Sequence, residues 1–318
     1  MGRRAAIILG ASAALSACAI EPPPRNAAPY PPAPSATDAP DSTDPSPSPR
    51  HASLTEEQPS SAEDAPSGSP AAATEKPEPD ATPVPTPGSN HIASANAYAV
   101  PAETVHTWLT TRSGPATKTA FLTFDDGPSV LTPQFLDTLK ALGVHATFFV
   151  IGRMLELNPA PVQRAMAEGH AICLHSYSHD YAYLYPGRVG NVVNIATDYD
   201  HALSVAKRVL GPTYAPSGYR YPGGHMSWSG LGDADIALAQ RGVTWIDWNC
   251  MSGDAERRPP ASPDQAVAML TATYTAAGSP NAAVMLSHDT WGAHITLAAL
   301  PQFVQFFRDR GYGFGVIG

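Results

Sequence analysis

The chain has 318 residues, enough for two average domains, but its composition is uneven along its length. About 19 of its 34 prolines fall between residues 21 and 90, and residues 21–100 carry roughly −8 of the overall charge of −9. The remaining segment, about 220 residues long, is nearly neutral, which argues against a nucleic acid as partner because phosphate binding requires a basic surface. That segment can bury a large core as a single domain.

The N-terminus is typical of an export signal. Two arginines precede an apolar segment, residues 5–15, that is too short to cross a bilayer. Residues 15–18 read Leu-Ser-Ala-Cys and resemble the bacterial lipobox, which predicts a signal peptide over residues 1–18 and lipidation of Cys18. We therefore expect a cell-envelope lipoprotein that contacts the membrane only through this anchor. The alternative is an ordinary secretory signal cleaved near Ala17.

Residues 19–100 are rich in Pro, Ala, Ser, Thr, Asp and Glu and lack periodic apolar positions. Such a segment buries too little apolar surface to offset the entropy of ordering, which predicts a disordered, partly polyproline-like tether. As a random coil it would reach roughly 50 Å. The tether would either let a domain at residues 101–318 reach a polymer near the membrane or only hold that domain clear of the surface.

From about Thr117 onward, short apolar segments alternate with helical patterns. Strands are expected over 119–124, 146–151, 171–174, 243–248, 282–286 and 312–317. Helices are expected over 132–143, 158–169, 191–210, 264–276 and 297–310. The first two helices start with a polar cap and a proline, at Thr132 and Asn158, and stop at a glycine. Repeated strand–helix units predict an α/β fold with a parallel sheet, closed or nearly closed as a barrel, whose catalytic face lies where strands end.

Two adjacent acids, Asp125 and Asp126, follow the first expected strand and precede Gly127-Pro128. Neighbouring strand residues point in opposite directions, so both acids can serve one site only if the strand has ended and the backbone turns. The Gly-Pro pair favours such a turn. The motif alone is compatible both with a functional site and with a plain turn.

Two histidines, His175 and His179, follow the expected strand at 171–174. At this spacing they would lie on one face of a helical turn, where they can share a metal ion. Two imidazoles with one carboxylate suit a hard or borderline ion and leave a position open for water. Alone, the pair is equally compatible with surface or core histidines.

Three further motifs follow along the chain. Arg220 precedes a Pro-Gly-Gly turn and could hold a carboxylate, although a structural surface arginine is the alternative. Asp254 lies shortly after the expected strand at 243–248. His288 follows the strand at 282–286, where a histidine can act as a general acid.

Two cysteines remain beyond the lipobox, Cys173 and Cys250, and each lies in an apolar, strand-like segment. An exported protein could join them in a disulfide. Two buried free thiols are equally compatible with the sequence.

Together and in this order, the five motifs resemble those of the NodB-homology polysaccharide deacetylases, which form carbohydrate esterase family four. The resemblance covers roughly residues 119–318 and is specific because all five motifs match with suitable gaps. It implies a distorted (β/α) barrel with about seven strands and a monomeric, metal-dependent enzyme that removes N-acetyl groups from an acetylated polysaccharide. Peptidoglycan N-acetylglucosamine is the first expectation. An O-acetyl esterase acting on a xylan-like polymer or exopolysaccharide, and a sugar-binding pseudoenzyme, are the alternatives.

The resemblance also implies a role for each motif residue. The metal ligands, with zinc as the expected ion, would be Asp126, His175 and His179. Asp125 would be the general base, and Arg220 would orient it. Such a metal ion polarises the amide carbonyl and lowers the pKa of bound water, so that the base can take a proton from it.

Four more residues receive roles from the same resemblance. His288 would protonate the leaving amine, and Asp254 would tune the pKa of His288. The backbone N–H of Tyr221 would help to stabilise the oxyanion, whose donors are worth roughly 3–4 kcal/mol each in comparable enzymes. Leu286 would line the pocket for the acetyl methyl group.

The fourth motif departs from the family pattern. Many members carry Asp-x-x-Asp-Trp, whereas residues 251–255 of this chain retain only the second acid, Asp254, and end in Ala255. The missing tryptophan leaves open how that side of the site is built. Trp228 or Trp291 could take its place, with core packing as the alternative for both. Three tyrosines could line the same site and stack on sugar rings, with an ordinary loop position as the alternative: Tyr181, Tyr183 and Tyr185.

Overall fold

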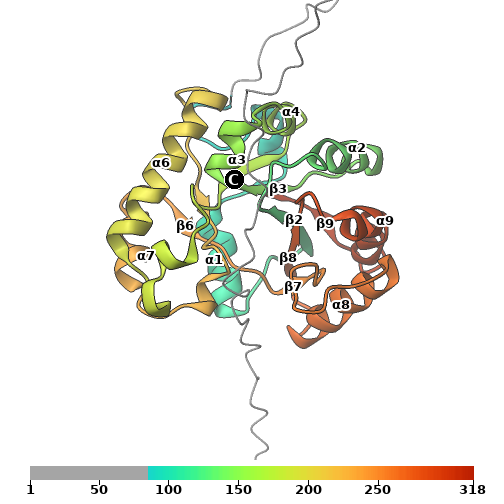
Figure 1. Cartoon of the computed structure of the whole chain (residues 1–318). Coiled ribbons are helices and arrows are strands. Elements are labelled where there is room, and N and C mark those ends of the chain that lie inside the picture. Colours follow the sequence, from blue (N-terminus) through green and yellow to red (C-terminus); the bar gives the residue numbers. More distant parts are fainter. Residues whose placement is uncertain (1–84) are drawn as a thin grey trace, which may run out of the picture. The chain divides into compact units, whose positions relative to one another are not determined.

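The structure, a computed structural model, describes residues 85–318 (Figure 1). The expected signal peptide, the lipobox cysteine and most of the expected tether lie outside the described residues. Within the described part of the chain, no helix combines the length and the apolar character needed to cross a membrane.

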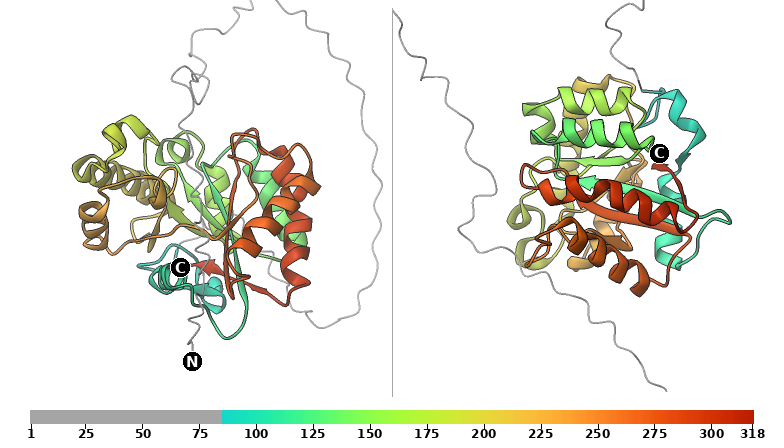
Figure 2. Two further views of the ribbon diagram at one scale, coloured as in Figure 1. Left: turned by 90° about the horizontal axis from the view of Figure 1, so that it is seen from below. Right: turned by 90° about the vertical axis from the view of Figure 1, so that its right-hand side faces the viewer.

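A curled parallel sheet forms the centre of the fold and makes a half-barrel (Figures 1 and 2). Its strands are β2 (Thr119–Asp125), β3 (Thr147–Val150), β4 (Ala171–Leu174), β5 (Gly218–Tyr219), β6 (Thr244–Trp245), β7 (Cys250–Met251) and β8 (Ala282–His288). They lie in the order β6-β5-β4-β3-β2-β8-β7, and β9 (Gly313–Phe314) also pairs with β2. All neighbouring pairs are parallel, so the predicted distorted (β/α) barrel with about seven strands is confirmed.

Helices surround the sheet, with α6 and α7 on one side and α2, α8 and α9 on the other (Figure 1). The α-helices are α1 (Ala102–Thr111), α2 (Thr132–Leu142), α3 (Gly152–Leu157), α4 (Ala160–Ala167), α5 (Tyr181–Leu184), α6 (Val192–Leu210), α7 (Gly232–Ala239), α8 (Pro263–Ala276) and α9 (His294–Arg308). Short 3₁₀ segments are η1 (Ala93–Ala97), η2 (Pro186–Arg188) and η3 (His225–Ser227).

The helix boundaries follow local sequence signals for the most part. α2 ends at Gly143, which has the left-handed backbone (φ 63°) that glycine adopts without steric cost. α6 begins after Asn191, whose side chain accepts the N–H of Asn194. The two expected polar caps are wrong: Thr132 is the first helical residue of α2, and Pro159 precedes α4 in place of an Asn158 cap.

The two faces of β2 belong to two separate parts of the core. Leu122 and Phe124 pack beneath the outer helices, where Phe124 meets the rings of Phe135 and Phe148. Phe121 faces the interior of the half-barrel, in a cluster that α1 closes from one end. Because alternate residues of a strand share a face, the polar side chains two and four positions after Phe121 continue along this interior. These side chains are Thr123 and Asp125, and Asp125 is the last residue of the strand.

Residues 85–100 are folded, although the sequence placed them in the tether. β1 (Ala99–Val100) pairs with β10 (Val316–Ile317) beside the C-terminus (Figure 2). The buried side chain of Asn90 donates to the carbonyl oxygen of Ile317 at 2.8 Å, and the ring of Tyr98 stacks on His145. The folded domain therefore begins before residue 101, because β1 and the side chain of Asn90 find their partners at the C-terminal end of the chain.

Cys173 and Cys250 are both free and fully buried, on β4 and β7. Of the two alternatives that the sequence left open, the structure contains the pair of buried thiols. Burial in apolar surroundings raises the pKa of the Cys173 thiol to about 12, which suits a packing role.

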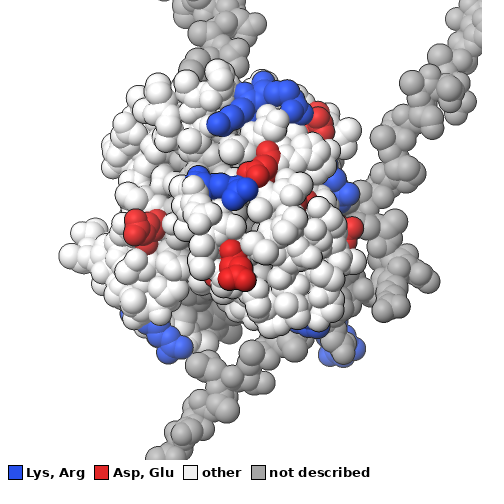
Figure 3. Space-filling view, turned by 90° about the vertical axis from the view of Figure 1, so that its left-hand side faces the viewer, with Lys and Arg blue, Asp and Glu red and all other residues white. Residues whose placement is uncertain are grey.

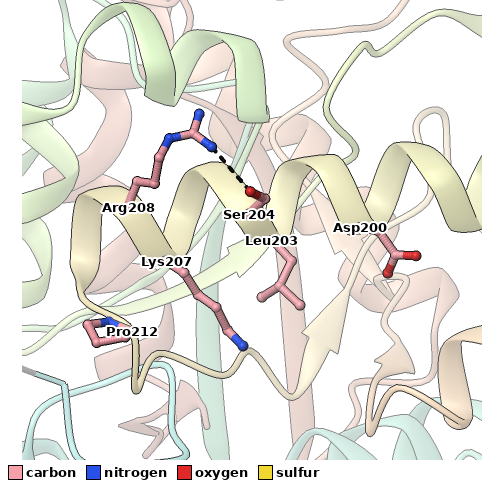
Figure 4. A pocket seen from close by; sticks show the side chains of 6 residues that line it. All are labelled: Asp200, Leu203, Ser204, Lys207, Arg208 and Pro212. Atoms are coloured by element: carbon pink, nitrogen blue, oxygen red, sulfur yellow. Dashed lines mark hydrogen bonds between the residues drawn. The ribbon is translucent and has the colours of Figure 1, made fainter.

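Charges on the face that carries α6 and α7 are scattered and of both signs (Figure 3). A shallow hollow of about 500 Å³ on α6 is lined by Asp200, Leu203, Ser204, Lys207, Arg208 and Pro212 (Figure 4). None of the residues that the motifs single out takes part in it.

Candidate functional site

The motif residues meet at the carboxyl ends of four strands. Asp125 ends β2 and lies directly opposite His288, the last residue of β8. His175 directly follows β4, and Arg220 directly follows β5. Because parallel strands end at the same edge of the sheet, residues far apart in sequence converge there.

The two adjacent acids point to different partners because the strand ends between them. Asp125 is the last residue of β2, and Asp126 has a left-handed backbone (φ 71°). The turn continues through Gly127, where an added Cβ atom would lie 2.4 Å from the Asp289 carboxylate, so only glycine fits. The expected turn after the strand is therefore present.

Arg220 is fully buried, which excludes the surface alternative. Its Nη1 donates to the carboxylate of Asp125 at 2.7 Å and to the hydroxyl of Thr123 at 2.8 Å. Its Nε donates to the carbonyl of Ile246 at 2.9 Å, and the guanidinium lies 4.0 Å from the ring centre of Phe149. Five fixed donors on a planar group make this an orienting contact.

Burial raises the pKa of Asp125 to about 6, although the positive charge of Arg220 opposes the shift. A carboxylate whose pKa lies close to neutral can both accept and release a proton near physiological pH. The contact with Arg220 thus holds in place an acid whose pKa suits a general base.

Three side chains form a cluster with metal-ligand spacing: Asp126, His175 and His179. Their ligand atoms lie within 4.8 Å of one another. The Asp126 Oδ1 atom lies 3.4 Å from Nε2 of His175 and 3.3 Å from Nε2 of His179. It is buried and has no hydrogen-bond partner among the described residues, which is the situation of an atom that accepts a coordination bond.

The protonation states of this cluster also suit a metal ion. Nδ1 of His175 lies 2.8 Å from the carbonyl of Arg220, which makes Nδ1 the donor and leaves Nε2 free as a ligand atom. Burial lowers the pKa of His175 to about 3, so the imidazole is neutral. Burial alone would raise the pKa of Asp126, but nearby positive charge, including that of His288 and Arg153, outweighs burial and the pKa is lowered. Two imidazoles and a carboxylate fit a divalent ion such as zinc.

The expected helical turn between the two histidines is wrong. Residues 175–179 form a loop in which Ser176 and His179 have left-handed backbones (φ 63° and 51°). The buried carboxylate of Asp198, on α6, accepts the N–H groups of Tyr177 and Ser178. Side chains brought together by a loop need such an external support, because no helical hydrogen bonds hold the spacing.

Asp198 belongs to none of the five motifs. A signal was present, since Asp198 lies on the buried stripe of α6 with Ile195 and Ala202, at positions i−3 and i+4. An acid on the apolar face of a helix requires a polar partner, and here the partner is the histidine loop.

His288 forms the second charged pair of the site, with Asp254. Its Nδ1 lies 2.8 Å from Oδ1 of Asp254, and its backbone N–H donates to Oδ2 at 2.9 Å. Thr296 donates to the same carboxylate at 2.7 Å. Burial would lower the pKa of His288, but Asp254, together with Asp126 and Asp125, outweighs it and raises the pKa to about 10. The imidazole is therefore protonated at neutral pH.

Tyr221 and Leu286 lie at the same edge. Among the described residues, the backbone N–H of Tyr221 has no acceptor, while its hydroxyl donates to Asp235 at 2.8 Å and its ring is buried. Leu286 lies two positions before His288 and hence on the same face of β8. Both positions are compatible with the roles that the resemblance implies.

The aromatic residues are divided between the core and the surface. Trp228 stacks on Tyr185 at a centroid distance of 4.1 Å, and Tyr185 is only 2% exposed, so a sugar ring has no access to it. Trp291 is 62% exposed. Neither tryptophan lines the cavity of about 310 Å³ that adjoins Asp126 and His288. Trp228 is therefore excluded as the replacement for the missing tryptophan, whereas Trp291, between the lining residues Thr290 and Gly292, stays a prediction.

Comparisons with known proteins agree with this geometry. Residues 112–234 match the polysaccharide deacetylase family. A peptidoglycan-N-acetylglucosamine deacetylase of Bacillus cereus is 31% identical over 202 residues, which are 64% of this chain and 70% of the relative. A solved carbohydrate esterase family four (CE4) esterase of Streptococcus mutans is 41% identical with a TM-score of 0.71, covering 75% of this chain and all of that one. The Bacillus cereus polysaccharide deacetylase Bc1974 is 31% identical with a TM-score of 0.53, covering 63% and 92%. The chain belongs to the polysaccharide deacetylases of carbohydrate esterase family four, a family of hydrolases.

Proposed function

We propose that this protein removes N-acetyl groups from peptidoglycan N-acetylglucosamine with the help of a divalent metal ion, most simply zinc. One observation carries the proposal: a carboxylate with a raised pKa, a three-ligand cluster and a protonated imidazole meet at neighbouring strand ends. Each of these is needed to hydrolyse an amide, because its carbonyl is a poor electrophile and its amine a poor leaving group.

The metal ion would be held by Asp126, His175 and His179, and when bound it would polarise the amide carbonyl and lower the pKa of water. Asp125 accepts a proton from the attacking water while Arg220 keeps its carboxylate in position. The N–H of Tyr221 is free to stabilise the negative charge that develops on the carbonyl oxygen.

The second half of the reaction requires an acid. His288 is protonated and donates to the departing amine, and Asp254 stabilises the imidazolium and fixes its orientation. Base and acid are thus two different residues with their pKa values shifted to suit opposite tasks.

Two considerations support peptidoglycan as the substrate. The Bacillus cereus relative is named for peptidoglycan N-acetylglucosamine. An exported protein with a lipidated Cys18 and a tether also meets the cell wall first. In a fractionation experiment, Cys18→Ser should move the protein from the membrane to the soluble fraction; unchanged membrane association would contradict the anchor.

The name of the Streptococcus mutans protein, an esterase, keeps hydrolysis of O-acetyl esters as a second candidate. Full-length protein loaded with zinc should release acetate from peptidoglycan and leave free amines on its glucosamine residues, detected by mass spectrometry. Acetate release from acetylated xylan, with no amine formed on peptidoglycan, would favour the esterase instead.

Two further experiments test the requirement for the metal ion and the role of Asp125 as the base. Chelation should abolish activity, and added zinc should restore it. Asp125→Asn should lower kcat/KM by roughly 10²–10⁴, whereas Asp137→Asn, an exposed acid on α2, should not change it. Full activity in Asp125→Asn or after chelation would overturn the mechanism.

A further inference from the structure

The cavity of about 310 Å³ beside the site has walls of two kinds. Asp126, Asp254 and His288 border it on the side of the reaction. The other walls come mainly from the loop after β7 and from the helices α8 and α9, and six small or apolar residues dominate them: Ala255, Pro259, Pro260, Ala266, Ala293 and Ile295. The reacting groups therefore open onto a largely apolar space.

A small residue, Ala255, borders the cavity next to Asp254. Ala255 occupies the position at which many members of the family carry tryptophan. Trp228 packs elsewhere, against Tyr185, and its Nε1 donates to the carbonyl of Pro222 at 2.8 Å. Trp291 is exposed. Among the described residues, no tryptophan lines the cavity that Ala255 borders.

The size of the cavity exceeds what an acetyl group needs. A methyl group occupies a volume similar to that of a water molecule, which is roughly 30 Å³ in the liquid. A cavity of about 310 Å³ is ten times larger and lies at the lower end of the range for small-molecule sites. An acetyl methyl would leave most of it unfilled.

The shape of the cavity favours the end of a chain over the middle of one. Its inner wall includes Ala266, Ala293 and Thr296, which are all buried beneath the surface of α8 and α9. A polysaccharide continues in both directions from the sugar that carries the amide and must leave through solvent on both sides. A terminal acyl tail can end against these buried residues.

We infer that this enzyme also hydrolyses N-acyl groups longer than acetyl, such as propionyl and butyryl, with the acyl tail in the cavity beside Ala255. The inference rests on the proposed function and concerns the same site. Water adds to the acyl carbon, the carbon–nitrogen bond breaks, the amine takes a proton from His288, and the acyl group leaves as a carboxylic acid. Each methylene that enters the apolar cavity gains hydrophobic burial, worth about fourfold in kcat/KM.

The experiment compares glucosamine oligomers that carry N-acetyl, N-propionyl or N-butyryl groups, using the full chain loaded with zinc. We expect kcat/KM for the butyryl oligomer to equal or exceed that for the acetyl oligomer, because about two further methylenes are buried. Turnover of acetyl with butyryl slower by roughly 10³ would overturn the inference and leave the proposed function standing. Turnover of none of the three would overturn both.

Two variants test the location of the tail. Ala255→Trp should lower the butyryl-to-acetyl ratio of kcat/KM by about tenfold or more, because the indole fills the cavity. Ala272→Trp, an exposed position on α8, should leave the ratio unchanged. An unchanged ratio in folded Ala255→Trp would place the tail elsewhere and overturn the assignment. If Ala255→Trp does not fold, the wild-type kcat/KM values for the three oligomers test the inference by themselves.

Binding provides a readout that does not depend on turnover. In the Asp125→Asn background, isothermal titration calorimetry should show tighter binding of the butyryl oligomer than of the acetyl oligomer. The preference should disappear when Ala255→Trp is added. Equal affinity for both oligomers in the Asp125→Asn protein would contradict the inference.

Discussion

The site contains two histidines next to aspartates, the buried His175 and the partly buried His288, and they differ in charge: His175 is neutral and His288 is protonated. Burial lowers the pKa of His175 to about 3, and its Nδ1 contacts a neutral backbone carbonyl. For His288 the same burial is outweighed by the carboxylate of Asp254 on Nδ1, and the pKa rises to about 10. The group that contacts Nδ1 thus distinguishes the two histidines. A backbone carbonyl leaves His175 neutral, and a carboxylate keeps His288 protonated.

The largest effects should come from separating these two roles. His179→Ala removes a ligand, so zinc content and activity should both fall to background. His288→Ala should keep its zinc while kcat/KM falls by roughly 10²–10⁴. Inductively coupled plasma mass spectrometry together with steady-state kinetics measures both. Loss of zinc in His288→Ala would show that the two histidines do not differ in role.

A smaller effect is expected from removing the charge that raises the pKa of His288. In the wild type, activity should rise as Asp125 deprotonates near pH 6 and should fall only as His288 deprotonates near pH 10. Asp254→Asn should lower the pKa of His288, move the alkaline limb to lower pH and reduce kcat at pH 8 by about tenfold or more. A pH profile of kcat measures this, with the exposed Asp309→Asn as control.

The Asp254→Asn variant should also change how the free energy of unfolding depends on pH. Because the pKa of His288 is raised on folding, its contribution to the free energy of unfolding is fully present below the unfolded value of about 6.5. It is lost as the pH rises through about 10. Asp254→Asn should therefore destabilise the protein at pH 6 and much less at pH 11. Equal destabilisation at both values would contradict a charged His288–Asp254 pair.

The smallest effect concerns the loop that holds the metal cluster. Asp198→Ala leaves the N–H groups of Tyr177 and Ser178 without their acceptor, which should cost about 1–3 kcal/mol of unfolding free energy. Zinc affinity should weaken by roughly 10–100-fold, and excess zinc should restore activity. Asp200→Ala, two residues away on the same helix, removes only an exposed ion pair with Arg241 and should cost at most about 1 kcal/mol. Equal zinc affinities in the two variants would contradict a supporting role for Asp198.

Local pattern was sufficient for the fold class but not for every element, since the two-residue strands β5 and β7 were not predicted. Alternating apolar segments and helical patterns predicted the parallel sheet, and the stop signal at Gly143 predicted the end of α2, because hydrophobic periodicity and left-handed glycine act within a few residues. The strand-end positions of Asp125 and His288 followed in the same way, since parallel strands end at one edge.

By itself, the sequence determined the fold class, the order of the motifs and the identity of the acids and histidines that gather at one edge. Only the tertiary structure decided that residues 85–100 belong to the domain, that Asp198 supports the histidine loop, and that Ala255 lines a cavity beside the site. These features depend on contacts between segments far apart in the chain, such as Asn90 with Ile317. Burial and distant partners set their energies, and neither can be read from neighbouring residues.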